Sequence, residues 1–335
     1  MKRFLDAFTM AEILLSLTII GVVAAITLPS LTGNINERTW NTQRKALYAR
    51  FSQALSLMPN LNGYGTLHAA GTSTDADGSV TSVDAEDDAA MAFLTEGLTK
   101  VLKTTNLCDY DALEDCGIPD TITAMNGDVL SNFTTSYNTL VAFNSMFDGT
   151  YNASNADGTT TSYTYSQLDT KAAAFETANG ESILVYYNPN CVADMQETGW
   201  HYTQPKMCAN FVYDLNGNKG PNTVGKDIGF ITALYPSDPV VVAPFPMASN
   251  AGTSAQTEAG ALCKAQDSEA RLPNRDELSA MFYNRTLLGI SSGHFWSGSV
   301  ISSGESGTAW IQGFGTGHRG PRTRSNSYYV RCVRR

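Results

Sequence analysis

The sequence is poor in charge and in histidine. Only 16% of the 335 residues are Asp, Glu, Lys or Arg. The four histidines are scattered and show no spacing typical of zinc ligands; they are His68, His201, His294 and His318. The sequence contains no G-x-S-x-G, H-E-x-x-H or phosphate-binding glycine motif. We therefore expect that the protein is not an enzyme and has no cofactor, with the exception of a calcium ion considered below.

The charges are unevenly distributed along the chain. The net charge is −10, but the segment from Lys264 to the end contains ten Lys or Arg and five Asp or Glu. This segment therefore carries +5 and the remainder −15. The acidic part argues against nucleic-acid binding, whereas the basic C-terminal segment favours an anionic partner.

The six cysteines include no C-x-x-C pair, which argues against a zinc site or a thioredoxin-like redox centre. An even number of cysteines outside the membrane suggests disulfides. Their positions favour three local pairs, which are Cys108 with Cys116, Cys191 with Cys208, and Cys263 with Cys332. Six cysteines allow many other arrangements, so the connectivity stays open at this point.

A run of 19 residues, 13–31, contains no charged side chain. A helix needs about 20 residues to cross a bilayer. The leader, residues 1–7, carries two basic residues, which favour a cytoplasmic N-terminus. Because no clean signal-peptide cleavage site follows the run, we expect processing before it, between Ala7 and Phe8.

Glu12 is a single carboxylate at the head of this run. On insertion scales, a carboxylate near hydrocarbon costs about 2.5–3.5 kcal/mol, so it usually has a partner or a role. Cleavage would create an amine on Phe8, which cannot easily reach Glu12 in its own helix but could reach that of a neighbouring subunit. We therefore expect Glu12 to act in assembly. The alternative is an ordinary anchor in which Glu12 has no such role.

The segment from Ala7 to Glu12, followed by the apolar run, resembles the processing and methylation segment of type IV pilins and type II secretion pseudopilins. Pro29 stands where pilin helices commonly kink, and Ala7 stands where the family most often has glycine. The resemblance implies that prepilin peptidase removes residues 1–7 and that Phe8 is N-methylated. It also implies assembly with other pilin subunits, from the inner membrane into a filament in the periplasm or on the cell surface.

The helical pattern continues beyond the apolar run. Apolar residues recur on one face of the predicted helix; they are Trp40, Leu47, Phe51, Leu55 and Met58. Pro59 and Asn60 then indicate its end. We expect one helix from about Phe8 to Met58, within an assembly segment that covers residues 8–60.

Residues 61–235 are expected to form a pilin-like globular body. Its predicted strands are Ile183–Tyr187, Ala209–Leu215 and Ile228–Leu234. Between the last two strands, the sequence DLNGNKGPNTVGKD contains five oxygen-bearing side chains among glycines, which are Asp214, Asn216, Asn218, Asn222 and Asp227.

This loop has two interpretations. Flexible loops with hard oxygen ligands bind calcium, and the ligands considered are Asp214, Asn216, Asn218 and Asp227. The pattern departs from the EF-hand, because Lys219 stands where a glycine is needed. A plain hairpin turn at Asn216-Gly217 needs no metal, and this second interpretation is favoured.

Residues 236–335 are expected to form a further α+β domain, after a proline-rich junction whose VVVAPF run could be its first strand. One helix is predicted from about Thr257 to Ala265. A second follows Asn274, which is a plausible N-cap because Glu277 lies three residues later. Three short strands rich in aromatic residues and valine follow.

This segment resembles the C-terminal domain of the Legionella collagen-like adhesins, a branch of the C-type-lectin-like fold. The matching residues are Cys263, Arg271-Leu272-Pro273, Glu277-Leu278, Phe295-Trp296-Ser297, Ala309-Trp310 and Val330-Arg331-Cys332-Val333. The resemblance implies a disulfide-closed scaffold with surface loops that bind ligands, in some members glycosaminoglycans. The fold also contains formylglycine-generating oxidases with a cysteine pair, but here the cysteines match the structural bridge.

The loops between the predicted strands are polar and rich in arginine, whose guanidinium group suits sulfate and carboxylate. The predicted ligand-binding residues are Ser303, Glu305, Trp310, Gln312, His318, Arg319, Arg322, Arg324, Asn326 and Tyr328. The alternative is a solvated basic loop without a particular partner. For Trp296 and Trp310, core packing is the favoured interpretation. In some bacteria and phages this fold carries binding loops diversified by retroelements, and we state this as a hypothesis for the present loops.

We therefore expect an α+β protein with a long N-terminal pilin helix, a small antiparallel-sheet pilin body and a C-type-lectin-like α+β domain. The expected function is that of a type IV pilin-like filament subunit, which displays an adhesin domain for an extracellular glycan or protein. The alternative is a pseudopilin of a type II secretion or DNA-uptake machine, in which the C-terminal domain contacts an exported substrate.

Overall fold

The structure is a computed structural model that describes residues 10–62, 89–133, 149–154, 160–165, 172–187, 206–235, 240–242, 244–304, 306–315 and 317–334. It divides into two compact units, Met1–Ala46 and Leu47–Arg335.

Helix α1 (Met10–Asn62) is 53 residues long. It agrees with the predicted helix except at its C-terminal end, because it continues through Pro59 to Asn62. The predicted end was therefore a few residues too early. A proline removes one backbone hydrogen bond, but its fixed φ is compatible with a helix, and helix boundaries are uncertain by one or two residues.

In the first unit, α1 has many exposed apolar side chains. Those with described burial are Leu14, Leu15, Leu17, Ile19, Ile20, Val22 and Val23. Within the described part of the chain, no helix combines the length and the apolar character needed to cross a membrane.

In the second unit, the last part of α1 packs against a sheet. Its buried apolar residues lie on one helical face and are Leu47, Phe51, Ala54, Leu55 and Met58. The ring centroid of Phe51 is 6.2 Å from that of Phe175 and 5.0 Å from that of Phe211. Helix α2 (Ala89–Glu96) contributes Phe93, whose ring lies against Tyr187 at 4.5 Å. The sheet face next to α1 is therefore covered by aromatic packing.

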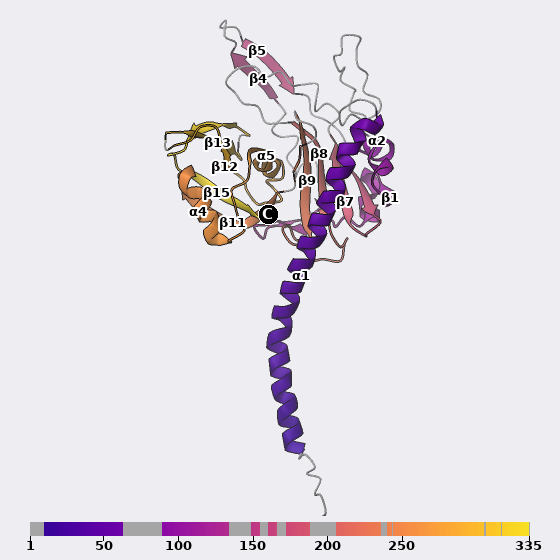
Figure 1. Ribbon diagram of the computed structural model, residues 1–335. Helices are drawn as coiled ribbons and strands as arrows, with labels where there is room; N and C mark the ends of the chain where they lie inside the picture. The colour runs from indigo at the N-terminus through magenta and orange to yellow at the C-terminus, as the bar shows by residue number, and fades with distance from the viewer. Residues whose placement is uncertain are drawn as a thin grey trace, which may run out of the picture. The chain divides into compact units, whose positions relative to one another are not determined.

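This sheet has six strands in the order β1-β6-β7-β8-β9-β10, and each neighbouring pair is antiparallel (Figure 1). The strands are β1 (Thr104–Cys108), β6 (Ala173–Thr177), β7 (Ser182–Tyr187), β8 (Lys206–Asp214), β9 (Ile228–Tyr235) and β10 (Val240–Val242). The three strands predicted from the sequence correspond to β7, β8 and β9. Every residue of β7 is buried, which is expected of a central strand covered on both faces.

The C-terminal segment forms a five-stranded sheet in the order β11-β15-β12-β13-β14 (Figure 1). The strands are β11 (Phe245–Ser254), β12 (His294–Val300), β13 (Thr308–Gly313), β14 (Arg319–Thr323) and β15 (Tyr328–Arg334). Strands β12 and β15 are parallel, and the other neighbouring pairs are antiparallel. Strand β14 was not predicted, because its residues read as part of a polar loop.

Two helices accompany this second sheet, as predicted. Helix α4 (Gln256–Gln266) precedes α5 (Arg275–Tyr283). The Asn274 side chain accepts hydrogen bonds at the start of α5, and the Glu277 side chain accepts one from the Asn274 backbone N–H. This is the predicted capping box.

The two sheets share one hydrophobic core. Leu278 and Phe282 of α5 belong to the same buried cluster as Leu184 and Phe230 of the first sheet. The prediction that the run VVVAPF is the first strand of the second domain was wrong for its valines. They form β10, which belongs to the first sheet because Val241 pairs with Ala233 of β9. The backbone of Val240–Val242 pairs with the edge of the first sheet, and the second sheet begins at Phe245.

The remaining elements are short. They are the 3-10 helices η1 (Leu98–Lys100) and η2 (Tyr110–Cys116), the hairpin of β2 (Ile122–Thr123) and β3 (Val129–Leu130), and the hairpin of β4 (Gly149–Ser154) and β5 (Thr160–Tyr165). The chain is thus an α+β protein with mainly antiparallel sheets, which confirms this part of the predicted fold class.

Candidate functional site

The predicted ligand-binding residues are distributed over β13, β14 and the adjoining turns. Along β13, Ala309 and Ile311 belong to the buried cluster around the Cys263–Cys332 disulfide. Side chains alternate along a strand, so Trp310 and Gln312 lie on the opposite face of the sheet. Trp310 is half-buried there.

Two arginines lie over the Trp310 ring. The guanidinium carbon of Arg275 is 5.3 Å from the ring centroid, and that of Arg319 is 5.5 Å from it. Both distances are within the range of cation–π attraction. Arg275 comes from the first turn of α5 and keeps 43% of its side chain exposed. Sequence reasoning did not find Arg275, because only the tertiary packing of α5 on β13 brings it to Trp310.

Arg319 was predicted in an exposed binding loop, and this prediction was wrong. It lies in β14 opposite Gln312, with 8% of its surface exposed. Its Nη1 donates to Ser279 Oγ at 3.3 Å and lies 3.8 Å from Asp276 Oδ1. The pKa of Arg319 is lowered to about 10, chiefly by burial and then by the charge of Arg275, while Asp276 opposes the shift. Arg319 is therefore part of the packing between β14 and α5.

Arg322 and Arg324 are half-buried, and the acceptors of their hydrogen bonds described below are not carboxylates. Arg322 donates from Nη1 to the carbonyl of Pro321 at 2.8 Å, and its Nη2 lies 3.2 Å from His318 Nε2. Arg324 donates from Nε to Gln256 Oε1 at 2.7 Å and from Nη1 to the carbonyl of Gly304 at 3.2 Å. Neutral acceptors do not cancel the guanidinium charge, so these two arginines retain their positive charge. Arg322 pairs with Ala309 in the sheet register, so its side chain lies on the face opposite Trp310.

The other predicted ligand residues do not form one patch. Gln312 is fully buried and donates from Nε2 to the carbonyls of Gly313 and Gly317, so it is a core residue. Tyr328 packs its ring 5.0 Å from that of Trp296. Ser303 and Asn326 are exposed. Glu305 lies outside the described residues.

The loop between β8 and β9 contains the candidate calcium ligands. Asp214 and Asp227 are buried, whereas Asn218 is exposed and Asn216 is half-buried. Asp227 accepts hydrogen bonds from the backbone N–H groups of Asn222 and Thr223, at 2.8 and 2.9 Å. In the described part of the chain, no three His, Cys, Asp or Glu side chains form a metal-binding group, so a cation here would depend on amide oxygens as well as carboxylates.

The carboxyl group of Asp214 has an unusual environment. Its Oδ1 accepts from the Asn216 N–H at 3.1 Å. Burial raises the pKa of Asp214 to about 7; the hydrogen bond from Asn216 lowers it, and the nearby charge of Asp227 raises it. Gly217 has φ +62°, but Asn216 is not among the described non-glycine residues with positive φ, as a two-residue hairpin turn would require. β8 ends at Asp214 and β9 begins at Ile228, so residues 215–227 form a longer loop, and the predicted plain hairpin turn was wrong.

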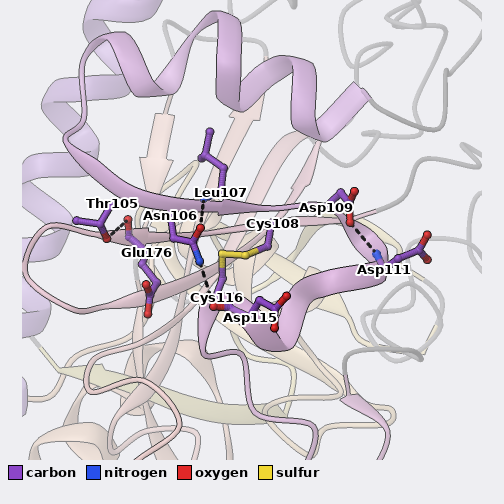
Figure 2. Close-up of a disulfide and its surroundings, with 9 residues drawn as sticks. All are labelled: Thr105, Asn106, Leu107, Cys108, Asp109, Asp111, Asp115, Cys116 and Glu176. Atoms are coloured by element: carbon purple, nitrogen blue, oxygen red, sulfur yellow. Dashed lines mark hydrogen bonds between the residues drawn. A yellow bond between two sulfur atoms is a disulfide. The ribbon is translucent and has the colours of Figure 1, made fainter.

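Two disulfides occupy the positions expected from the sequence. Cys108 at the end of β1 is bonded to Cys116 at the end of η2 (Figure 2). Beside it, Asn106 Nδ2 donates to the Asp115 carbonyl at 3.1 Å. Cys263 of α4 is bonded to Cys332 of β15, and both residues are fully buried.

The remaining predicted sites are only partly described. Cys208 is disulfide-bonded, whereas Cys191 lies outside the described residues, as do Ala7 and Phe8. Glu12 and Pro29 belong to α1, and their side chains are outside the described set. Their roles in processing and assembly stay predictions.

Comparison with known proteins gives no relative: no protein-family model matches the chain, and no curated protein matches it.

Proposed function

We propose that the protein is a type IV pilin-like filament subunit that displays a ligand-binding C-terminal segment outside the cell. The main support for this proposal is that the two ends of α1 have different surroundings. Its first part has exposed apolar side chains such as Leu14 and Ile20, whereas Phe51 and Leu55 in its last part are buried on an antiparallel sheet. A helix with one part free for other helices and one part bearing a domain suits a filament subunit.

The route to the filament follows the resemblance of the N-terminal segment. Prepilin peptidase removes residues 1–7, Phe8 is N-methylated, and the subunit resides in the inner membrane before assembly. Glu12 then pairs with the Phe8 amine of a neighbouring subunit. The filament lies in the periplasm or at the cell surface.

Three features support a C-type-lectin-like arrangement of residues 236–335. These are two helices between the first strand, β11, and the other four strands of a five-stranded sheet, the parallel contact of β12 with β15, and the disulfide that joins α4 to β15. The proposed ligand is an extracellular glycan or protein with sulfate or carboxylate groups. Its proposed binding surface is formed by Arg322 and Arg324, whose hydrogen bonds to carbonyl and amide oxygens leave the guanidinium charge unneutralised. Arg275 lies over Trp310 on the other face of β13.

A pseudopilin of a secretion or DNA-uptake machine is the second candidate. It has the same N-terminal segment and also requires assembly. The hydrophobic core that the two sheets share favours the pseudopilin. A C-terminal segment that packs into the globular body suits a compact subunit that contacts an exported substrate. Long surface fibres that contain the protein would support the adhesin, and short periplasmic assemblies would support the pseudopilin.

The test of filament assembly is the substitution Glu12→Ala, with Glu37→Ala on the same helix as the matched control. We expect the Glu12→Ala subunit to be processed and held in the membrane but absent from sheared filaments, whereas Glu37→Ala is incorporated. Normal incorporation of the Glu12→Ala subunit would contradict the proposal. Immunogold labelling of whole cells with antibody to the C-terminal segment then distinguishes surface fibres from a periplasmic location.

A further inference from the structure

Three buried side-chain oxygens in the loop between β8 and β9 have no hydrogen-bond donor among the described residues. They are Asp214 Oδ2, Asn216 Oδ1 and Asn222 Oδ1. Asp214 as a whole is only 2% exposed. Buried acceptors without a partner are rare in folded proteins because each loses its hydration without compensation. Three of them within nine residues require an explanation.

The three side chains are neighbours in space. Asp214 contacts Asn216 through the hydrogen bond from the Asn216 N–H to Asp214 Oδ1. The Asn216 side chain contacts Gly220, because its Nδ2 donates to the Gly220 carbonyl at 2.7 Å. Asn222 Oδ1 also borders Gly220, since a Cβ atom placed on that glycine would lie 4.0 Å from it. The side chains of Asn216 and Asn222 thus both border Gly220, and Asp214 contacts Asn216.

The hydrogen bonds of the two amides fix which atom is left free. Asn216 directs Nδ2 to the Gly220 carbonyl, and Asn222 directs Nδ2 to Asn218 Oδ1 at 3.4 Å. In both side chains the nitrogen has an acceptor, so the oxygen is the atom that remains without a partner. Asn218 is exposed, and its contact makes it a positioning residue for Asn222.

Asp227 orders the loop and adds negative charge. It is completely buried, and its two carboxylate oxygens accept the Asn222 and Thr223 N–H groups. Its charge acts on Asp214. Lys219, the residue that breaks the EF-hand pattern, is exposed. The backbone path of the loop, with positive φ at Gly217 and Asn222, does not explain the three unpartnered oxygens.

We propose that the loop Asp214–Asp227 binds a calcium-type divalent cation, with Asp214 Oδ2, Asn216 Oδ1 and Asn222 Oδ1 as ligands. This revises the ligand set expected from the sequence, because Asn222 replaces Asn218 and Asp227 becomes a positioning residue. Carboxylate and amide oxygens without histidine or cysteine suit calcium, which accepts six to eight oxygen ligands in flexible geometry. Magnesium demands stricter octahedral geometry and keeps its waters. The inference does not depend on the proposed filament function.

Bound calcium would join the end of β8 to the start of β9, since Asp214 pairs with Ile228 in the sheet register. A cation that binds the folded chain and not the unfolded chain raises the apparent stability by mass action. The effect should be measurable at millimolar calcium, because extracellular calcium modules bind with dissociation constants of about 0.1–1 mM.

The experiment uses the full chain, purified in detergent and stripped with EGTA. Its melting temperature is measured during titration with calcium chloride or magnesium chloride, and displacement of terbium luminescence reports binding directly. At calcium about 100-fold above the dissociation constant, the gain of about 2.7 kcal/mol should raise the melting temperature by about 4 °C. Magnesium at the same concentration should produce a clearly smaller rise.

Three variants make the test specific. Asp214→Asn removes one charge without changing the shape, and we expect at least a tenfold loss of calcium affinity. Asp111→Asn makes the same change at an exposed position of η2 and should respond as the unmodified chain does. Asn222→Asp adds a ligand charge at a position with φ +49°, which aspartate tolerates, and should tighten binding several-fold.

Two results would overturn the proposal. One is the absence of both a calcium-dependent melting shift and terbium binding in the unmodified chain. The other is an equal calcium response of Asp214→Asn and the unmodified chain, which would place the cation elsewhere. If Asp214→Asn does not fold, Asn222→Asp decides the question, because unchanged or weaker calcium binding by that variant is incompatible with Asn222 as a ligand.

Discussion

Asn210 and Asn284 exchange two hydrogen bonds in the interior of the protein. Asn210 Nδ2 donates to Asn284 Oδ1 at 2.9 Å, and Asn284 Nδ2 donates to Asn210 Oδ1 at 3.0 Å. Both residues are fully buried, and Thr232 Oγ1 also donates to Asn210 Oδ1. Asn210 belongs to β8 of the first sheet, and Asn284 follows α5. The two predicted globular segments are therefore connected by a satisfied polar network as well as by apolar contacts.

Because of this network, Asn284→Ala should destabilise the whole second unit. Truncation leaves the amide of Asn210 buried with fewer partners, for which we expect a loss of about 2–3 kcal/mol in the free energy of unfolding. Denaturant unfolding should remain a single transition by circular dichroism and by tryptophan fluorescence. Asn326→Ala, at an exposed position, is the control. Two separate transitions would contradict the coupling of the two segments.

The sequence predicted those elements whose pattern is local. The strands β7, β8 and β9 follow from short apolar runs, and α5 follows from its capping box at Asn274. Each of these signals depends on residues within a few positions of one another. Helix α1 was predicted for the same reason.

The sequence did not predict what depends on tertiary contacts. Strand β14 contains Pro321, which is typical of loops but is tolerated on an edge strand. The burial of Arg319 depends on its contacts with Trp310 and Ser279, and no local pattern indicates them. In the loop between β8 and β9, the pattern indicated a group of oxygen-bearing residues but not which of their oxygens are engaged in hydrogen bonds. Only the hydrogen bonds distinguish Asp227, whose oxygens are engaged, from Asp214.

Arg319 and Arg322 should respond differently to substitution by alanine. Arg319→Ala removes a buried side chain from the face of Trp310, so we expect it to lower the free energy of unfolding by about 1–3 kcal/mol. Arg322→Ala should change it by about 0.5 kcal/mol or less, because the residue is on an edge strand and partly exposed. Urea denaturation of both variants measures the difference. Equal stability losses would contradict the assignment of Arg319 to the packing of α5.

Binding to sulfated polysaccharide should depend on Arg322 and Arg324. We expect the full chain in detergent to bind heparin at low salt and to lose most of this binding at high salt, as charge-dominated contacts do. The variant Arg322→Ala/Arg324→Ala should bind at least tenfold more weakly. Arg38→Ala, an exposed arginine of α1, controls for net charge. Heparin binding that is unaffected by the double substitution would exclude this surface, and absence of binding would direct the search to protein ligands.

The two described disulfides should contribute unequally to stability. The Cys263–Cys332 bond spans 69 residues and the Cys108–Cys116 bond spans eight. By loop entropy, their removal should cost roughly 4 and roughly 2.5 kcal/mol, respectively. Paired Cys→Ser variants, compared by denaturant unfolding under oxidising conditions, measure both losses. A larger loss for the short loop would mean that native packing around the sulfurs outweighs the entropy of the unfolded chain.

The pH dependence of stability should reveal the carboxyl group of Asp214 in calcium-free buffer. Its pKa is raised from 3.8 to about 7, chiefly by burial. Between these values the folded chain holds a proton that the unfolded chain has released, so this group's contribution to stability is complete below about pH 4 and is lost as the pH rises through 7. Asp214→Asn has no such proton to lose.

The measurement is the difference in the free energy of unfolding between Asp214→Asn and the unmodified chain, at several pH values with EGTA present. The free energy of unfolding of Asp214→Asn should increase relative to that of the unmodified chain from pH 4 to pH 7, and the difference should then remain constant. Above the raised pKa, the carboxyl group of Asp214 is ionised in both the folded and the unfolded chain. Subtraction removes the contributions of the carboxyl groups that do not interact with Asp214, and leaves that of the Asp214–Asp227 pair. A difference that does not vary with pH would mean that water or a cation already relieves the burial of this carboxylate, and the calcium titration of the same variant separates those two causes.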